Sequence, residues 1–158
     1  MGSTTQNSKD IHASAEQVYN AFINPQVLES WQAPGDMIAR IHNFDPRVGG
    51  GYEMSLFYPD NEQQMKGKTT DKEDRFTARF VELVPFKKIV QAIRFDTANP
   101  DFAGEMIMEI TFQPVEAGTR VTMLFKNIPK GIRPEDNEAG TISSLEKLSK
   151  YVEAKAEE

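Results

Sequence analysis

The sequence has 158 residues, 39% hydrophobic and 27% charged, proportions typical of one globular domain rather than of a disordered or membrane-spanning chain. It contains no cysteine, which excludes disulfides, thiolate nucleophiles and zinc–thiolate sites and agrees with the cytoplasmic location that we expect. The net charge is −6 with no basic stripe, which argues against a nucleic-acid partner, and the lack of a long apolar run argues against membrane insertion.

The first part of the chain predicts a short strand followed by two short helices. After a polar start, a first strand is expected at residues 9–12. Ser14 followed by Gln17 is a capping-box pattern, which marks the beginning of a helix. Asn24 and Pro25 are preferred residue types for the cap and the first position of a second helix.

The middle of the chain alternates apolar and polar residues, which predicts strands. Gly118 marks a hairpin between the last two of them, and the polar residues 59–72 predict a loop with a short strand near residues 66–70. Antiparallel strands joined by short loops indicate an α+β fold with a sheet of six or seven strands. After residues 9–12, the expected strands are residues 37–44, 51–58, 74–84, 87–95, 104–113 and 118–127.

A long helix is predicted from residue 134 to about residue 156. Pro134 suits the first helical position, and the acidic residues behind it stabilise the positive end of the helix dipole. Apolar residues from Ile142 to Val152 recur at helical spacing, so we expect this stripe to lie across the apolar face of the sheet. We interpret the second half of the helix, from Leu145 onward, as the anchor to the sheet.

The first half of the same helix is rich in small residues, and we interpret it as the roof of a pocket. Gly140 lies inside it, and a glycine within a helix costs about 1 kcal/mol relative to alanine, so close approach to the sheet or to a ligand should compensate. Four methionines, Met54, Met106, Met108 and Met123, fall on the inner face of the predicted sheet, where they suit an irregular surface. The alternative is that these side chains form an ordinary core.

We therefore predict a cavity between the sheet and the long helix, which binds a small apolar or amphipathic molecule. The polar end of this cavity is assigned to Tyr58 and Gln91, with His42 as a further candidate, although a histidine bonded within the structure is the favoured explanation for His42. The remaining candidate lining residues are Trp31, Met54, Phe80, Met106, Met108, Phe125, Gly140 and Ile142.

The sequence carries no catalytic signature. Its two histidines, His12 and His42, are thirty residues apart and have no companions at metal-ligand spacing, so we expect no metal and no cofactor. The glycines at residues 49–51 are not a phosphate loop, because no Lys-Ser/Thr follows and a strand comes next. Arg47, in the same turn, either braces the turn by bonding Asp45 or stands at a pocket mouth. Binding is thus favoured over catalysis, which stays open.

Several segments resemble the motifs of one protein family. Residues 44–52, FDPRVGGGY, resemble its F-D-P-R-x-G-G turn, and residues 79–85, RFVELVP, resemble its R-F-x-E-L-x-P strand end. From about residue 11 to residue 152, the chain is similar to the proteins grouped with the activator of heat-shock protein 90 ATPase, within the START/polyketide-cyclase (SRPBCC) superfamily. Further matching segments are residues 102–106, 118–121, 127–132, 135–140 and 144–145.

The resemblance implies a helix-grip (START-like) fold, in which a curved antiparallel sheet wraps around the long C-terminal helix, two short helices follow the first strand, and a mainly hydrophobic cavity is enclosed. Superfamily members bind lipids, hormones, polyketides or other apolar molecules, and a minority catalyse cyclisation or hydrolysis. The co-chaperone that names the family joins this domain to a second one that engages the chaperone.

The length of 158 residues leads us to expect a single stand-alone domain over residues 1–158, with an ordered core from about residue 9 to residue 156. Its expected partner is a small apolar molecule, and we expect a monomer or a homodimer. Two alternatives accompany the binding function. One is activation of a chaperone ATPase through protein–protein contact, and the other is a cyclase- or hydrolase-type enzyme that uses the same cavity.

Overall fold

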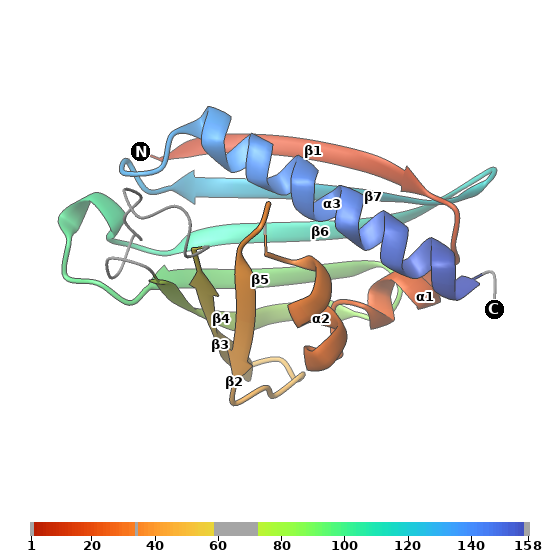
Figure 1. The fold of residues 1–158 in the computed structure, drawn as a ribbon, viewed down its shortest axis with the longest axis horizontal. Helices are drawn as coiled ribbons and strands as arrows, with labels where there is room; N and C mark the ends of the chain where they lie inside the picture. The colour runs from red at the N-terminus through yellow and green to blue at the C-terminus, as the bar shows by residue number, and fades with distance from the viewer. Residues whose placement is uncertain (1, 34, 59–72, 157–158) are drawn as a thin grey trace.

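The computed structural model describes residues 2–33, 35–58 and 73–156, which form a seven-stranded antiparallel sheet crossed by a long helix (Figure 1). Strands two to seven follow one another as neighbours, and the first strand joins the sheet beside the seventh, in the order β1-β7-β6-β5-β4-β3-β2. This arrangement is the predicted α+β helix-grip fold. The strands are β1 (Ser3–Ile11), β2 (Ile38–His42), β3 (Gly51–Phe57), β4 (Glu73–Val84), β5 (Lys88–Phe95), β6 (Met106–Val115) and β7 (Gly118–Ile128).

Three α-helices accompany the sheet in the described ranges: α1 (Ala15–Asn20), α2 (Pro25–Trp31) and α3 (Pro134–Ala156). Both bonds of the predicted capping box are present at the start of α1, between Ser14 and Gln17. At the start of α2, the Asn24 side chain accepts hydrogen bonds from the next two free backbone N–H groups. A 3₁₀ turn, η1 (Pro100–Phe102), lies before β6. The short strand predicted near residues 66–70 lies outside the described residues.

The first strand is longer than the sequence pattern suggested. It begins at Ser3, six residues before the predicted strand at residues 9–12, and pairs with β7 from Ser3 opposite Ile128 to Ile11 opposite Thr119. A search for apolar alternation overlooks it, because most of its side chains are polar. The pairing therefore depends on backbone hydrogen bonds and on polar cross-strand contacts.

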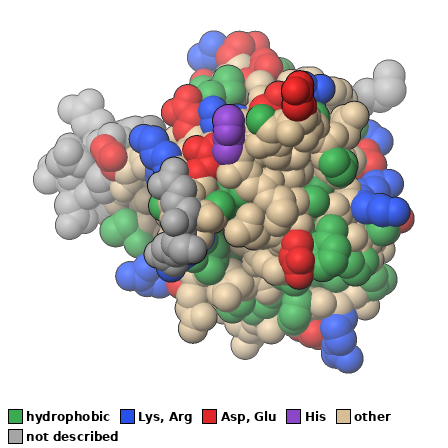
Figure 2. All heavy atoms as spheres, turned by 90° about the vertical axis from the view of Figure 1, so that its right-hand side faces the viewer, with side chains coloured by type: hydrophobic (Ala, Val, Ile, Leu, Met, Phe, Trp, Pro, Cys, Tyr) green, Lys and Arg blue, Asp and Glu red, His purple; other side chains and the backbone are tan. Residues whose placement is uncertain are grey.

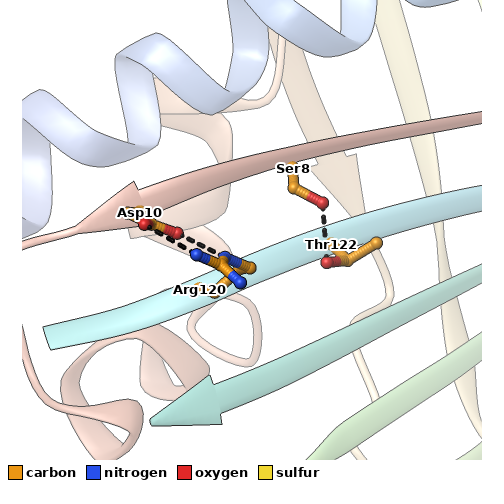
Figure 3. Close-up of polar contacts among 4 residues, drawn as sticks. All are labelled: Ser8, Asp10, Arg120 and Thr122. Atoms are coloured by element: carbon orange, nitrogen blue, oxygen red, sulfur yellow. Dashed lines mark hydrogen bonds and ion pairs between the residues drawn. The ribbon is translucent and has the colours of Figure 1, made fainter. Parts of the chain in front are cut away.

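Two of these polar contacts lie side by side on the β1–β7 pair (Figure 3). The hydroxyls of Ser8 and Thr122 are 2.8 Å apart, and the Arg120 guanidinium donates to both carboxylate oxygens of Asp10, at 2.7 and 3.1 Å. This bidentate bond holds the pKa of Asp10 below its ordinary value. Because the pair is exposed, it fixes the strand register more than it adds stability.

The long helix α3 crosses one face of the sheet, over β7 and beside β1 (Figure 1). Its second half buries Leu145, Leu148 and Val152, the apolar stripe that the sequence predicted. The helices α1 and α2 contact α3 and lie on the same side of the sheet, toward the C-terminal half of α3. None of the helices in the described ranges is long and apolar enough to cross a membrane.

Aromatic rings fill the space between the sheet and the helices near α1. The aromatic cluster consists of Tyr19, Phe22, Trp31 and Phe112, which meet edge to face at centroid distances of 4.7 to 5.6 Å. On the surface of this end of the molecule, hydrophobic side chains are scattered between acidic and basic ones (Figure 2). This end is thus a densely packed core with a mixed polar surface.

Candidate functional site

A cavity of about 470 Å³ lies between the sheet and the first half of α3. Its apolar wall comes from five neighbouring strands, because inward-facing side chains alternate along each of them. The size is within the range of cavities that hold small ligands. The side chains of this wall are Leu56, Phe76, Ile93, Phe95, Met106, Met108, Met123 and Phe125.

The first half of α3 covers the cavity with one face. Five of its residues line the cavity, as two adjacent pairs and a fifth residue that follow one another at intervals of three or four, which brings them to one side of the helix. All are small or polar, so the roof leaves space where the leucines of the second half do not. They are Asp136, Asn137, Gly140, Thr141 and Ser144.

The cavity brings together six of the eleven residues predicted for it, namely Trp31, Tyr58, Met106, Met108, Phe125 and Gly140. Trp31 is 1% exposed, and its indole N–H donates to the carbonyl of Ala21 at 3.0 Å, which fixes the ring where the aromatic cluster borders the cavity. The other five, His42, Met54, Phe80, Gln91 and Ile142, lie elsewhere.

Ile142 was misplaced by one position. It is 47% exposed, whereas its neighbour Thr141 is 6% exposed and lines the cavity. Successive residues of an α-helix are about 100° apart, so Gly140 and Ile142 differ by about 200° and cannot face the same space. The apolar type of Ile142 suggested a buried stripe, but the rotation of the helix is set by Leu145, Leu148 and Val152.

His42 was also misplaced, for a reason of strand alternation. Along β2, Ala39 is buried while His42 is exposed, and the His42 Nε2 lies 3.3 Å from the hydroxyl oxygen of Ser55 on β3. The histidine is bonded within the structure, which was the alternative explanation. It takes no part in the cavity.

Met54 and Phe80 belong to the packed core instead of the cavity wall. Phe80 packs against the rings of Phe44 and Tyr52, at centroid distances of 6.0 and 5.9 Å, and Met54 is fully buried. Both side chains point to the predicted inner face of the sheet. The sequence pattern identifies that face but not which part of it is filled.

Gln91 forms a buried polar pair with Tyr52 behind the cavity. The Tyr52 hydroxyl lies 3.4 Å from the Gln91 Oε1 and 3.3 Å from its Nε2. Burial raises the pKa of Tyr52 to about 12, and the amide groups of Gln91 and Gln32 beside the hydroxyl oppose part of this rise. Because Gln32 itself lines the cavity, this polar pair borders it without being part of its wall.

The cavity wall contains a buried carboxylate that was not predicted from the sequence. Asp74 is 1% exposed, and the Tyr58 hydroxyl donates to its Oδ2 at 2.9 Å. A usable signal existed, because Asp74 precedes Phe76 by two residues and must share its inner face in an extended strand. A carboxylate at such a position is unusual and marks a polar part of the site.

The segment after α2 forms another part of the wall, and α3 holds it in place. The Ser144 hydroxyl donates to the carbonyl of Gln32 at 2.7 Å, and the Lys147 ammonium donates to the carbonyls of Ala33 and Gly35 at 2.6 and 2.5 Å. In the part of the chain that the structure describes, the side-chain oxygen of Gln32 is buried without a hydrogen-bond partner.

The glycine-rich turn before β3 is structural. The Arg47 guanidinium donates to both carboxylate oxygens of Asp45, at 2.9 and 3.0 Å. Arg47 therefore braces the turn, which was the first of the two alternatives predicted for it. Gly49 has a φ of 89°, and a Cβ on Gly51 would overlap the carbonyl oxygen of Ala78. The turn therefore needs glycine for backbone reasons rather than for phosphate binding.

Comparison with known proteins places the chain in a family. The sequence model of the family described as "Activator of Hsp90 ATPase homolog 1-like protein" matches residues 12–153. The crystal structure of protein CV1439 from Chromobacterium violaceum is 31% identical, with a TM-score of 0.84 over 95% of this chain and 96% of that one. No curated protein matches the chain.

Two more distant structures share the fold. The solution structure of an AHSA1-like protein from Aeromonas hydrophila is 20% identical, with a TM-score of 0.74 over 99% of this chain and 96% of that one. The crystal structure of protein NE0264 from Nitrosomonas europaea is 17% identical, with a TM-score of 0.71 over 96% and 95% of the two chains. At these identities, the likeness concerns the fold alone.

Proposed function

Because the chain belongs to the family of Activator of Hsp90 ATPase homolog 1-like proteins, we propose that it uses the helix-grip scaffold to bind a small apolar or amphipathic molecule. The observation that supports this most is the cavity of about 470 Å³ under α3, with an apolar wall and a few polar groups. The ligand would lie between the methionines of β6 and the small residues of α3. Function as a monomer or homodimer in the cytoplasm is part of the same proposal.

The proposal is tested with N-phenyl-1-naphthylamine, a neutral apolar probe whose fluorescence rises in a dry site. Trp31 is the single tryptophan of the sequence and lines the cavity, so energy transfer from its indole to the probe is expected when the probe binds there. Saturable binding of one probe per chain is expected. Non-saturable binding, or binding without energy transfer from Trp31, contradicts the proposal.

A matched pair of variants locates the probe. Gly140→Leu adds a bulky side chain to the face of α3 that lines the cavity, and Ala139→Leu adds the same bulk to an exposed neighbouring position. Leucine favours helix more than glycine does, so Gly140→Leu is expected to fold. It should weaken probe binding at least about tenfold, by steric exclusion, and Ala139→Leu should leave it unchanged. Equal binding to both variants would place the probe elsewhere.

Catalysis in the same cavity is the second candidate, supported by the hydrogen-bonded pair of Tyr58 and Asp74 in its wall. A carboxylate that accepts a phenolic proton can act as a general base through that hydroxyl. This candidate predicts that bound apolar esters or ketones are converted by the wild type and not by Tyr58→Phe. Recovery of unchanged compounds after prolonged incubation removes it for those compounds.

Activation of a chaperone ATPase is a third candidate, supported by the description of the family. It predicts that the purified protein raises the turnover of a purified bacterial chaperone of the corresponding class in a saturable way. Unchanged turnover over a wide concentration range excludes it. A filled cavity in Gly140→Leu should not affect such activation, because the contact would be made by the outer surface.

A further inference from the structure

We propose that three methionines of the cavity wall, Met106, Met108 and Met123, are sites of oxidation by hydrogen peroxide, and that their conversion to sulfoxides releases an apolar ligand. The effect on binding rests on the proposed function, whereas the selective oxidation rests on the cavity alone. The sequence contains no cysteine, so its thioether groups are the sulfur groups that an oxidant meets.

The three methionines form one patch on two neighbouring strands, β6 and β7. Met106 and Met108 are two residues apart on β6, so both point to the inner face of the sheet. Met108 lies opposite Phe125 of β7, and Met123 precedes Phe125 by two residues, which makes the two methionines diagonal neighbours on that face. Thioether groups from adjacent strands therefore make up much of the cavity wall over β6 and β7.

The cavity gives a small oxidant access to side chains that the outer surface of the molecule does not expose. The three methionines are only 4–5% exposed, little more than Met54, which is 0% exposed. Their cavity of about 470 Å³, however, extends to the start of α3, where its lining residues Gly131 and Asp136 are exposed. Hydrogen peroxide is only slightly larger than water, so it fits such a space. Met54 lies in the packed core outside the lining, so peroxide reaches it only after a local opening.

Oxidation by hydrogen peroxide changes a thioether from an apolar to a polar group. The sulfur lone pair attacks one peroxide oxygen, the O–O bond breaks as the S–O bond forms, and the proton on the transferred oxygen passes to the departing hydroxide, which leaves as water. The sulfur loses two electrons and the peroxide gains them, so no further reactant is needed. A sulfoxide in the wall binds water, which an apolar ligand must displace without replacing the hydrogen bonds. Affinity for an apolar molecule should therefore fall.

Peptide mapping by mass spectrometry tests the selective oxidation. The folded wild-type protein is treated with hydrogen peroxide for increasing times, the reaction is stopped with catalase, and the sulfoxide is quantified at each methionine. Met106, Met108 and Met123 are expected to oxidise at least about fivefold faster than Met54, since the core must open locally before peroxide reaches Met54. Equal rates at these positions, or a faster rate at Met54, would overturn the inference and leave the proposed function intact.

Binding of N-phenyl-1-naphthylamine after removal of the peroxide tests the release of ligand. The oxidised protein should bind the probe at least about tenfold more weakly than the untreated protein, with its circular dichroism unchanged. Unchanged affinity after oxidation of all three methionines, or a loss that accompanies unfolding, would contradict release by a polar wall. Untreated protein that binds no probe would remove the proposed function and the release of ligand with it, while the oxidation rates still decide the selectivity.

Leucine variants separate the methionines of the cavity from the methionine of the core. Leucine has a similar volume and no sulfur, so the triple variant Met106→Leu, Met108→Leu, Met123→Leu is expected to fold. Whatever its own affinity for the probe, this variant should keep that affinity after peroxide treatment, whereas Met54→Leu should lose affinity as the wild type does. Met108→Leu alone is the second test variant and should lose less affinity than the wild type. Loss of binding by the treated triple variant would place the sensitive group elsewhere and overturn the inference.

Discussion

The two ends of the space between the sheet and its helices differ in how they are filled. Near α1, the aromatic cluster packs ring against ring, with Phe22 only 4.7 Å from Trp31 between centroids. Under the first half of α3, flexible methionines such as Met108 line a cavity of about 470 Å³ together with Gly140 and Thr141. Both ends use the same inner face of the same sheet. The difference shows that the helices above the sheet decide where the core is closed and where it is open.

The largest expected effect tests this difference through stability. Phe22→Ala should lower the free energy of unfolding by about 3–5 kcal/mol, because the ring is buried among Trp31 and Phe112 and the rigid neighbours cannot close the gap. Met108→Ala should cost only about 2 kcal/mol, because one side of this side chain already faces a cavity. Urea unfolding of both variants measures the two values. Similar losses would mean that the two ends are packed alike.

The polar pair behind the cavity offers a test in pH. The pKa of Tyr52 is raised to about 12 by burial, whereas an unfolded tyrosine titrates near 10. Between pH 10 and 12 the unfolded chain therefore loses this proton while the folded chain keeps it. Stability should fall by about 1.4 kcal/mol per pH unit in this range, and the contribution is fully present below pH 10.

The control for this prediction is Tyr52→Phe, which removes the ionisable group and should lack this part of the pH dependence. The comparison is made by urea unfolding at several pH values between 9 and 11.5, so that other tyrosines and lysines contribute equally to both proteins. An identical slope in both proteins would mean that Tyr52 titrates normally. Water would then reach the hydroxyl through the open end of the core.

The overall fold could be predicted from the sequence, because its signals are local. The caps at Ser14 and Asn24, the period-two strands and the long helix each follow from neighbouring residues. The first strand was predicted too short, since its polar side chains carry no apolar alternation and its length is set by β7, more than a hundred residues away. The sequence of a strand contains little information on its pairing with a strand that is far away in the chain.

The cavity could be predicted only in part. The alternation of apolar and polar residues identifies the inner face of a strand, and Met106 and Met108 on that face line the cavity as predicted. Met54 and Phe80 follow the same alternation but lie in the packed core. Whether an inward-facing side chain packs against an aromatic ring or lines the cavity depends on the segment that covers this part of the sheet. Asp74 could have been found, since it lies two residues before Phe76 in the same strand.

A smaller effect is expected at the attachment of the cavity wall to α3. Lys147→Met removes the ammonium that donates to the carbonyls of Ala33 and Gly35, and should cost about 1–2 kcal/mol, because those carbonyls lose charged donors. Lys150→Met, at an exposed position one turn further along, is the matched control and should cost much less. Hydrogen exchange should also be faster at the Gly35 amide in Lys147→Met alone. Unchanged exchange there would show that the wall does not depend on this attachment.

The smallest effect is expected at Ile142, and it tests the rotation of α3 over the open end. Ile142→Gln replaces a side chain that is 47% exposed and about 200° around the helix from Gly140, so the free energy of unfolding should change by less than about 0.5 kcal/mol. Binding of the naphthylamine probe should stay as in the wild type, whereas Thr141→Gln, one residue earlier on the cavity face, should weaken it. If Ile142→Gln instead disturbs binding while Thr141→Gln does not, α3 presents a different face to the sheet in solution. The assignment of Asp136, Gly140 and Ser144 to the cavity roof would then be wrong as well, since all three share the rotation of Thr141.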